Sequence, residues 1–170
     1  MPDPVCRIAA LVALGSNQGD SPRLVRAAMK RLAGLSVDPP RCSSLWQTSP
    51  VDCPPGSPPF INAVAMLFPR AEETPETLLD ALQALEREFG RQPKAVLNES
   101  RPLDLDLIAF GEETRATPGL VLPHPRACQR RFVLAPLAEV APNLVLPGQT
   151  KAVRDLLASL RSTEAVRRLE

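Results

Sequence analysis

The order of strand-type and helix-type segments constrains the fold of this chain more than any other feature of its sequence. Two segments, 22–34 and 74–90, carry apolar residues at the spacing of an amphipathic helix. Four short apolar or alternating runs are typical of β-strands, and they are residues 8–14, 42–47, 61–68 and 103–110. The order along the chain is therefore βαββαβ. It predicts an α+β sandwich with both helices on one face of a mainly antiparallel sheet.

Local residues indicate where the two helices begin. Ser21 is suited to cap the first helix, with Pro22 as its first residue. Thr74 precedes Pro75 in the same way at the start of the second helix. Both helices are therefore expected to start at a hydroxyl-bearing cap.

The C-terminal part of the chain has weaker periodicity. A short apolar segment occupies 132–137, and residues 153–160 have the pattern of an amphipathic helix, which the sequence allows to continue through 166–169. Internal repeats, low-complexity tracts and linkers are absent from the sequence. We therefore expect a single domain over residues 1–170 with a C-terminal helical extension.

Composition and charge exclude several classes of protein. The chain has 170 residues, with 20 Lys and Arg against 19 Asp and Glu, and its net charge of +1 argues against nucleic-acid binding by phosphate neutralisation. Apolar runs stay well below the roughly 20 residues that a membrane-spanning helix needs. The sequence therefore predicts a protein that binds neither nucleic acid nor a membrane.

Cysteine spacing and the N-terminal residues bear on localisation. The four cysteines are Cys6, Cys42, Cys53 and Cys128. Their spacing matches neither a zinc site nor a disulfide framework, so we expect a cytoplasmic protein. A signal peptide that ends at Gly15 is the alternative, although Asp3 weakens the positively charged start that such a peptide needs.

Proline and glycine mark the expected loops. Proline accounts for 20 of the 170 residues and is concentrated in 50–59 and 118–125, which predicts two long loops with stiffened backbone. The segment 15–19 (GSNQG) predicts a turn. It lacks the glycine and lysine spacing of a dinucleotide fingerprint or a P-loop.

Asp104 and Asp106 are the strongest chemical feature of the sequence. In the alternating segment 103–110 (LDLDLIAF), residues two apart share a face, so their carboxylates are expected about 6 to 7 Å apart. Ile108 and Phe110 continue this face, which predicts that it is covered along its length. Two such carboxylates repel each other unless a cation lies between them, and oxygen ligands at this spacing suit Mg²⁺. The alternative is a half-exposed strand whose aspartates face water.

Basic residues flank this pair. Arg91 and Arg101 lie at the two ends of the preceding loop, with Lys94 between them, and guanidinium groups are suited to stabilise a phosphate chain during transfer. His124, the single histidine, lies between two prolines shortly before Arg130, and its functional interpretation is a second phosphate clamp. The alternative for both segments is a solvated basic loop.

Two of the five phenylalanines do not fit an obvious core pattern. Phe60 and Phe132 lie beside polar residues, and one interpretation is that their rings enclose a flat heterocycle. Asn62 offers both a donor and an acceptor to the edge of such a ring. The alternative is that both phenylalanines belong to the core.

Five motifs occur in one order along the chain. They are ALGSN at 13–17, FINA at 60–63, RPLDLDL at 101–107, PHPR at 123–126 and RRFVLAPL at 130–137. Together they resemble the hydroxymethyl-dihydropterin pyrophosphokinase family of folate biosynthesis, over about residues 8–142. Five motifs in one order are far more specific than any one of them.

The resemblance implies a fold and an activity. The fold is a ferredoxin-like α/β/α sandwich, and the reaction moves pyrophosphate from ATP to the hydroxyl group of 6-hydroxymethyl-7,8-dihydropterin and releases AMP. The implied partners are therefore ATP and a reduced pterin, and we expect a monomer. The loops 48–60 and 91–101 resemble mobile lids that close over both substrates and expel water.

The resemblance also implies roles for individual residues. Asp104 and Asp106 would hold two Mg²⁺ ions, while Arg91 and Arg101 would be catalytic. The residues implied for ATP are Gln83, Glu86, Leu107, His124 and Arg130. The residues implied for the pterin are Thr48, Pro50, Phe60, Asn62 and Phe132.

The second lid departs from the family pattern. Many members carry Trp-Gly-Pro before the lid arginine, where this chain has Asn98-Glu99-Ser100. A second basic residue of the family is replaced by Pro93, for which Lys94 is the candidate substitute. Phe60 stands where tyrosine is common, which keeps the ring and loses a hydroxyl.

Two other functions remain open at the level of sequence. A non-catalytic ferredoxin-like module that binds RNA would need aromatic residues at the centre of its sheet and a basic surface, and this sequence has neither. A kinase or nucleotidyltransferase would use the same aspartate pair but release a different nucleotide product. Identification of that product separates the alternatives.

Overall fold

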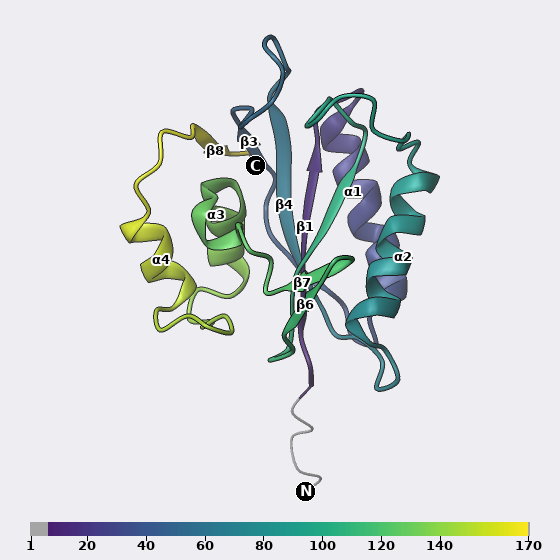
Figure 1. Cartoon of the computed structure of the whole chain (residues 1–170), viewed down its shortest axis with the longest axis vertical. Helices are drawn as coiled ribbons and strands as arrows, with labels where there is room; N and C mark the ends of the chain where they lie inside the picture. Colours follow the sequence, from purple (N-terminus) through teal and green to yellow (C-terminus); the bar gives the residue numbers. More distant parts are fainter. Residues whose placement is uncertain (1–6, 170) are drawn as a thin grey trace, which may run out of the picture.

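An antiparallel sheet of six strands lies between two pairs of helices in this computed structural model, which describes residues 7–169 (Figure 1). The strands are β1 (Ala10–Ser16), β2 (Arg41–Cys42), β3 (Trp46–Thr48), β4 (Phe60–Leu67), β5 (Asp104–Phe110) and β8 (Val166–Arg168). Their order in the sheet is β5-β1-β4-β3-β8, and β2 also pairs with β4. The sheet confirms the predicted α+β class.

Helices cover both faces of this sheet. They are α1 (Ser21–Leu32), α2 (Pro75–Glu88), α3 (Arg131–Val140) and α4 (Val153–Ser159). The two helices of the predicted βαββαβ order, α1 and α2, lie together on one face, and α3 and α4 lie on the other (Figure 1). The result is an α/β/α arrangement with a separate hairpin of β6 (Arg115–Thr117) and β7 (Leu120–Leu122).

The middle strands contribute to two cores because their side chains alternate between the faces of the sheet. In β1, Val12 and Leu14 pack under α1 and α2, whereas Leu11 packs under α3 and α4. This explains why β1 and β4 are apolar on both faces. Burial on both faces therefore fixes the register of the strands that carry the polar residues described below.

A bulge in β5 corrects the expected position of Phe110. Leu11 of β1 pairs with Ala109, and Val12 pairs with Leu107, so Ile108 is the extra residue. Phe110 consequently points into the core under α1 and α2, whereas Ile108 remains on the face of α3. The expectation that Phe110 continues the aspartate face is therefore wrong.

The cap of α1 and the strand expected at 42–47 also differ from the prediction. Asp20 caps α1 by accepting a hydrogen bond from the Arg23 N–H, while Ser21 is the first helical residue and accepts one from the Ser16 hydroxyl. The expected strand is interrupted between β2 and β3, and the latter continues to Thr48. The cap of α2 is Thr74, as predicted.

Two further segments differ from the prediction. Part of the proline-rich segment 118–125 belongs to the β6–β7 hairpin rather than to a loop. Residues Val166–Arg168 form the edge strand β8 instead of continuing a helix. The helix expected at 153–160 is present as α4.

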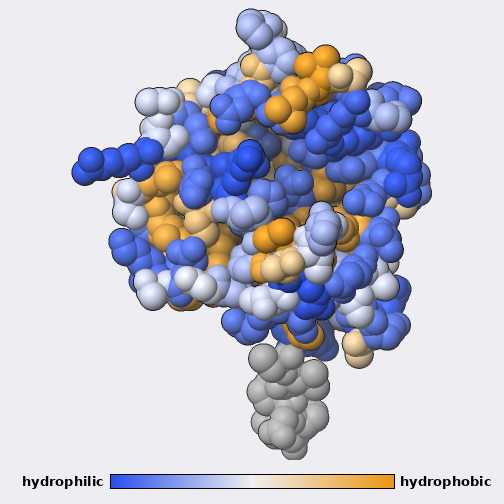
Figure 2. All heavy atoms as spheres, in the orientation of Figure 1, coloured by the Kyte–Doolittle hydropathy of each residue, from blue (hydrophilic) through white to orange (hydrophobic). Residues whose placement is uncertain are grey.

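The remaining structural observations concern membrane-spanning helices, the surface and the cysteines. In the part of the chain that the structure describes, none of the helices is both long and apolar enough to span a membrane. Hydrophobic atoms on the visible face lie in separate patches (Figure 2). Cys42, Cys53 and Cys128 are free thiols, and Cys6 lies outside the described residues.

Candidate active site

Three neighbouring strands place polar groups in one row. Gly15 of β1 pairs with Asn62 of β4 on one side and with Asp104 of β5 on the other. Ala13 pairs with Asp106, so the second carboxylate lies two residues further along the same face of β5. A Cβ at Gly15 would come within 2.8 Å of Asn62 Oδ1. Gly15 therefore makes room for the Asn62 side chain, and it lies within strand β1. The turn expected at 15–19 begins only after this strand and includes Gly19.

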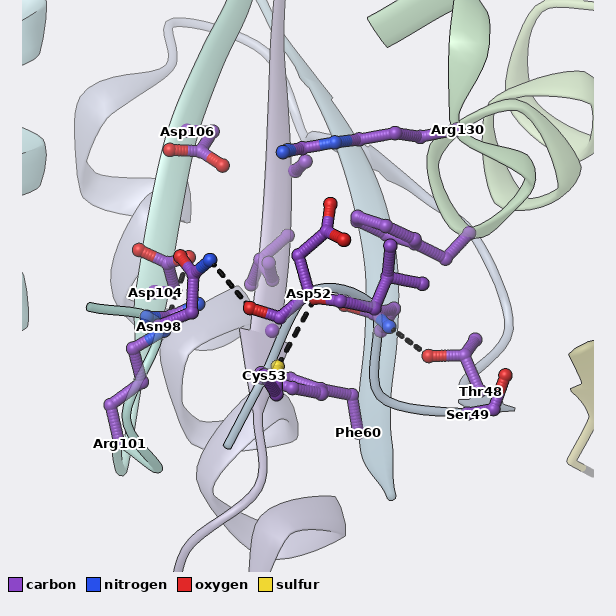
Figure 3. A pocket seen from close by; sticks show the side chains of 16 residues that line it. Thr48, Ser49, Asp52, Cys53, Phe60, Asn98, Arg101, Asp104, Asp106 and Arg130 are labelled. Atoms are coloured by element: carbon purple, nitrogen blue, oxygen red, sulfur yellow. Dashed lines mark hydrogen bonds and ion pairs between the residues drawn. The ribbon is translucent and has the colours of Figure 1, made fainter. Parts of the chain in front are cut away.

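This row opens into a cavity between the sheet, two loops and the start of α3 (Figure 3). Eight residues expected at the site line it: Thr48, Phe60, Asn62, Arg101, Asp104, Asp106, Arg130 and Phe132. The loops 49–59 and 91–101 also contribute residues that sequence reasoning did not single out, among them Val51, Asp52, Cys53 and Asn98. Residues far apart in the chain thus share one cavity.

The remaining expected site residues do not line this cavity: Pro50, Gln83, Glu86, Arg91, Leu107 and His124. Pro50 is exposed and lines a neighbouring cavity with Arg161. Gln83 is exposed on α2. Leu107 is 4% exposed and its side chain lies in the core under α1 and α2, which leaves its backbone as the part that can face a ligand.

Arginine side chains surround Asp104. Arg91 forms ion pairs with both Asp104 and Glu86, the latter at 3.0 Å. Arg101 Nε lies 3.4 Å from Asp104 Oδ2. Glu86 also accepts a hydrogen bond of 2.7 Å from the Leu105 N–H. Burial raises the pKa of Glu86, against the opposing effects of that hydrogen bond and of Arg91.

Asp106 is in a different environment from Asp104. Among the described residues, no side chain forms a hydrogen bond or an ion pair with it, although Arg130 extends from the start of α3 toward it (Figure 3). Burial and the negative charge of Asp104 raise the pKa of Asp106 to about 7, against the opposing charges of Arg130 and Arg101. The Asp106 carboxyl group therefore keeps its proton to a higher pH than an ordinary aspartate does.

Two aromatic rings and one amide form the opposite side of the cavity. Arg101 lies over the Phe60 ring at 5.6 Å, and Arg130 lies over the Phe132 ring at 5.3 Å. The amide Nδ2 of Asn62 donates to the Thr48 hydroxyl at 2.6 Å, which fixes the orientation of the buried amide. This arrangement suits a flat ring with polar edges.

Asn17 connects both loops to the sheet, and sequence reasoning assigned it only to a turn. Its Oδ1 accepts a hydrogen bond of 2.9 Å from the backbone N–H of Arg101. Its Nδ2 donates to the Pro58 carbonyl and to the Ser100 hydroxyl, each at 3.4 Å. The loops also contact each other directly, because Asn98 Nδ2 donates to the Asp52 carbonyl at 2.8 Å. Only the position of Asn17 in the ALGSN motif could have indicated this role.

His124 is placed beside β5 with a defined tautomer. Its backbone N–H donates to the Ile108 carbonyl at 2.8 Å, and its ring Nδ1 accepts from the backbone N–H of Arg126 at 3.2 Å. Burial, together with Arg130 and Arg126, lowers the pKa of His124. At neutral pH the ring is therefore uncharged and carries its proton on Nε2, which can donate to an anion.

The close approach of Gly15 and Asn62 gives a test of this geometry. We expect Gly15→Ala to lower the free energy of unfolding by about 1 to 3 kcal/mol, because the new Cβ forces the Asn62 side chain to move. Chemical denaturation measures the change. Gly34→Ala is the matched control, since a Cβ there meets no atom within 4 Å, and its stability should stay unchanged or rise slightly. Equal stability of Gly15→Ala and the wild type would contradict the geometry.

Comparisons with known proteins bear on this site. Residues 11–142 match the family model described as 7,8-dihydro-6-hydroxymethylpterin-pyrophosphokinase (HPPK). A 2-amino-4-hydroxy-6-hydroxymethyldihydropteridine pyrophosphokinase of Synechocystis is 38% identical over 157 residues, which cover 91% of this chain and 77% of the relative. The enzyme of the same name from Haemophilus influenzae is 38% identical over 83% of this chain and 86% of its own.

A solved structure agrees in fold. The wild-type HPPK-DHPS of Plasmodium falciparum matches 89% of this chain with a TM-score of 0.69 at 13% sequence identity. This chain spans 42% of that longer one, less than half of its length. The structural likeness therefore concerns the fold of one part of the longer protein.

Proposed function

Because this chain belongs to the 7,8-dihydro-6-hydroxymethylpterin-pyrophosphokinase family, we propose that it transfers pyrophosphate from ATP to the hydroxyl group of 6-hydroxymethyl-7,8-dihydropterin, giving the pterin diphosphate and AMP in folate biosynthesis. One observation carries the proposal for this site. A pocket suited to a flat ring shares one cavity with two carboxylates and two arginines, Arg101 and Arg130. A ring and a phosphate chain bound there would lie next to each other.

The pterin would bind between Phe60 and Phe132. The Asn62 amide is held by Thr48 through its Nδ2, so its Oδ1 remains available to accept a hydrogen bond from a ring N–H. Pro50 would contact the substrate only if the loop 49–59 moves inward, because it is exposed outside the main cavity. This loop would then act as a lid.

Asp104 and Asp106 fit a magnesium site, and we propose two Mg²⁺ ions there. Asp106 is a partly buried carboxylate without an ion pair among the described residues, and burial together with the charge of Asp104 raises its pKa. Within residues 7–169 there is no cluster of three or more His, Cys, Asp or Glu that could hold a metal. A two-carboxylate site of this kind suits Mg²⁺, whose remaining ligands are usually water and substrate phosphates. Bound there, Mg²⁺ would neutralise phosphate charge and orient the triphosphate.

The arginines would stabilise the group in transfer. Arg91 and Arg101 both contact Asp104, and Arg130 extends toward Asp106 from the opposite side. Guanidinium groups held in place beforehand need little rearrangement when negative charge develops. The substrate hydroxyl would attack the β-phosphorus directly, and this class of reaction depends mainly on positioning and charge stabilisation rather than on a covalent nucleophile.

The ATP side of the site would lie along β5 and α2. We assign it to Gln83, Glu86, the backbone of Leu107, Arg130 and the Nε2–H of His124. His124 is suited to this role because it is neutral and can donate to a phosphate or ribose oxygen. Glu86 already accepts hydrogen bonds from the Leu105 N–H and from Arg91, so it also links α2 to β5.

The nucleotide product tests the proposed function. The protein is incubated with ATP, Mg²⁺ and the hydroxymethyl pterin, and the nucleotides are separated by chromatography. We expect AMP together with pterin diphosphate in equal amounts. ADP as the product would indicate a simple kinase, and the absence of turnover would favour a binding module.

The raised pKa of Asp106 predicts a pH dependence of stability in the protein without Mg²⁺. Asp106 ionises near pH 3.8 in the unfolded chain but at about 7 in the folded one, so the folded state binds more protons between these values. The wild type therefore loses stability as pH rises from about 4 to 7. Asp106→Asn removes this loss, and we expect the variant to be more stable than the wild type at pH 8 by at least about 1 kcal/mol, because one pKa unit corresponds to roughly 1.4 kcal/mol.

Thermal or urea unfolding at pH 4 and pH 8, with a chelator present, measures this difference. The stability gap should disappear at pH 4 and should narrow at pH 8 when Mg²⁺ is added. Asp80→Asn on the exposed side of α2 is the control, for which we expect no pH-dependent gap. The same difference in stability between Asp106→Asn and the wild type at both pH values would contradict the raised pKa of Asp106.

A further inference from the structure

The C-terminal segment 160–169 lies outside the residues that match the family model, yet it contacts two walls of the cavity. On one side, β8 extends the sheet beyond β3, with Val166 paired to Thr48. Ser49 N–H donates to the Ala165 carbonyl at 3.0 Å, and the Ala165 N–H donates back to the Ser49 hydroxyl at 3.2 Å. Thr48 and Ser49 both line the cavity, so this wall is held from outside by the C-terminal segment.

On the other side, the same segment contacts the first turn of α3. The Phe132 N–H donates to Glu164 Oε2 at 3.1 Å. Arg130, the residue at the N-cap of α3, makes no side-chain capping bond, so this helix start depends on an acceptor from elsewhere in the chain. A carboxylate at a helix N-terminus also interacts favourably with the helix dipole. Arg131 adds a second contact, because its Nη2 donates to the Leu160 carbonyl at 3.0 Å.

The first turn of α3 is the part of that helix that reaches the cavity. It carries the Phe132 ring, which lines the cavity below Arg130. The backbone group that Glu164 binds belongs to the same residue as this ring. A shift of that turn would therefore move the aromatic wall directly.

We propose that Glu164 is a positioning residue for the pterin pocket: by accepting the hydrogen bond from the Phe132 N–H, it holds the ring in place before the substrate binds. The choice of pterin as the ligand rests on the proposed function, whereas the positioning itself does not. Preorganisation of this kind strengthens binding because the free protein does not have to order the wall when the ligand arrives.

Three variants test the proposal. Glu164→Ala removes the acceptor, Glu164→Gln keeps an acceptor oxygen without the charge, and Arg167→Ala is the matched control. Arg167 lies in β8 and its Nη2 contacts Gln47 Oε1 at 2.6 Å, so this control changes the same segment without changing the contact to α3.

The first readout needs no ligand. Hydrogen exchange at the Phe132 amide should become at least about tenfold faster in Glu164→Ala, because the amide loses its hydrogen bond to a charged acceptor. The rate in Arg167→Ala should stay within about twofold of the wild type. Unchanged exchange in Glu164→Ala would overturn the proposal, whatever ligand the pocket binds.

The second readout is catalytic. Glu164→Ala should raise the KM for the pterin by about fivefold to tenfold and change kcat and the KM for ATP by less than about threefold, and Glu164→Gln should recover most of the loss. In a Phe132→Ala background, Glu164→Ala should have little further effect on the pterin KM, since both changes act through the same ring. Additive effects of the two substitutions, or equal effects on both substrates, would overturn the proposal.

Failure of the proposed function would give a different result. In that case the wild type would not bind the pterin in a direct titration, whereas exchange at the Phe132 amide would still depend on Glu164. If Glu164→Ala does not fold, Glu164→Gln supplies the test, because it should still show measurably faster exchange than Arg167→Ala.

Discussion

Asp106→Asn is expected to lower kcat at least about 10³-fold while the protein stays folded. The substitution keeps the shape of the side chain but removes the charge of one of the two proposed metal ligands. Stabilisation of phosphate charge by a bound metal is worth several kcal/mol, and each 1.4 kcal/mol corresponds to about a tenfold change in rate. Steady-state kinetics measure the loss, and calorimetry should show that Mg²⁺ no longer strengthens ATP binding.

Asp80→Asn is the matched control for this experiment, because Asp80 is an exposed aspartate on α2, away from the cavity. It should leave kcat within about twofold of the wild type. A nearly active Asp106→Asn variant would remove the metal assignment, whereas loss of activity in the control would point to a general effect on the protein.

Arg101→Ala is expected to lower kcat by about 10² to 10³-fold and to weaken ATP binding much less. Arg101 contacts both sides of the cavity, since its guanidinium lies over the Phe60 ring and its Nε is 3.4 Å from Asp104 Oδ2. It is therefore placed where a pterin hydroxyl and a phosphate chain would meet. A group that acts on charge developing during transfer affects kcat more than ground-state binding.

Initial-rate kinetics together with equilibrium ATP binding separate these effects. Arg26→Ala on the exposed side of α1 is the control and should leave both quantities unchanged. If Arg101→Ala changed only KM, Arg101 would be a binding residue and not a catalytic one.

Local periodicity predicted the strand that carries the aspartates. The alternation in 103–110 placed Asp104 and Asp106 on one face, and β5 confirms this. The bulge at Ile108 was not predictable, because it depends on the pairing of β5 with β1 and not on the sequence of β5 itself. For this reason Phe110 turned out to be on the opposite face from the one expected.

The C-terminal segment shows the limit of local patterns most clearly. Residues 166–169 are too few to distinguish a helix from a strand by spacing alone. The edge of β3 decides the outcome, since Thr48 and Val166 pair across it. The contact between Glu164 and Phe132 joins residues 32 positions apart, and no local pattern indicates it.

The sequence predicted most of the side chains that line the cavity, but not the contacts that hold these side chains in place. Eight of the expected residues line one cavity, and the resemblance to the family pointed to them through its motifs. Asn17 and Gly15 were assigned to a turn because their roles depend on partners in other strands and loops. The loop residues Asp52 and Asn98 lie where no motif was recognised, and only the folded chain brings them together.

A crystal structure with a non-hydrolysable ATP analogue, Mn²⁺ in place of Mg²⁺ and the hydroxymethyl pterin tests the central claim most directly. We predict anomalous density for metal beside Asp104 and Asp106, with the phosphate chain reaching Arg101 and the pterin ring between Phe60 and Phe132. A bound nucleotide with no metal beside these carboxylates, or a pterin ring outside the two phenylalanines, would contradict the account.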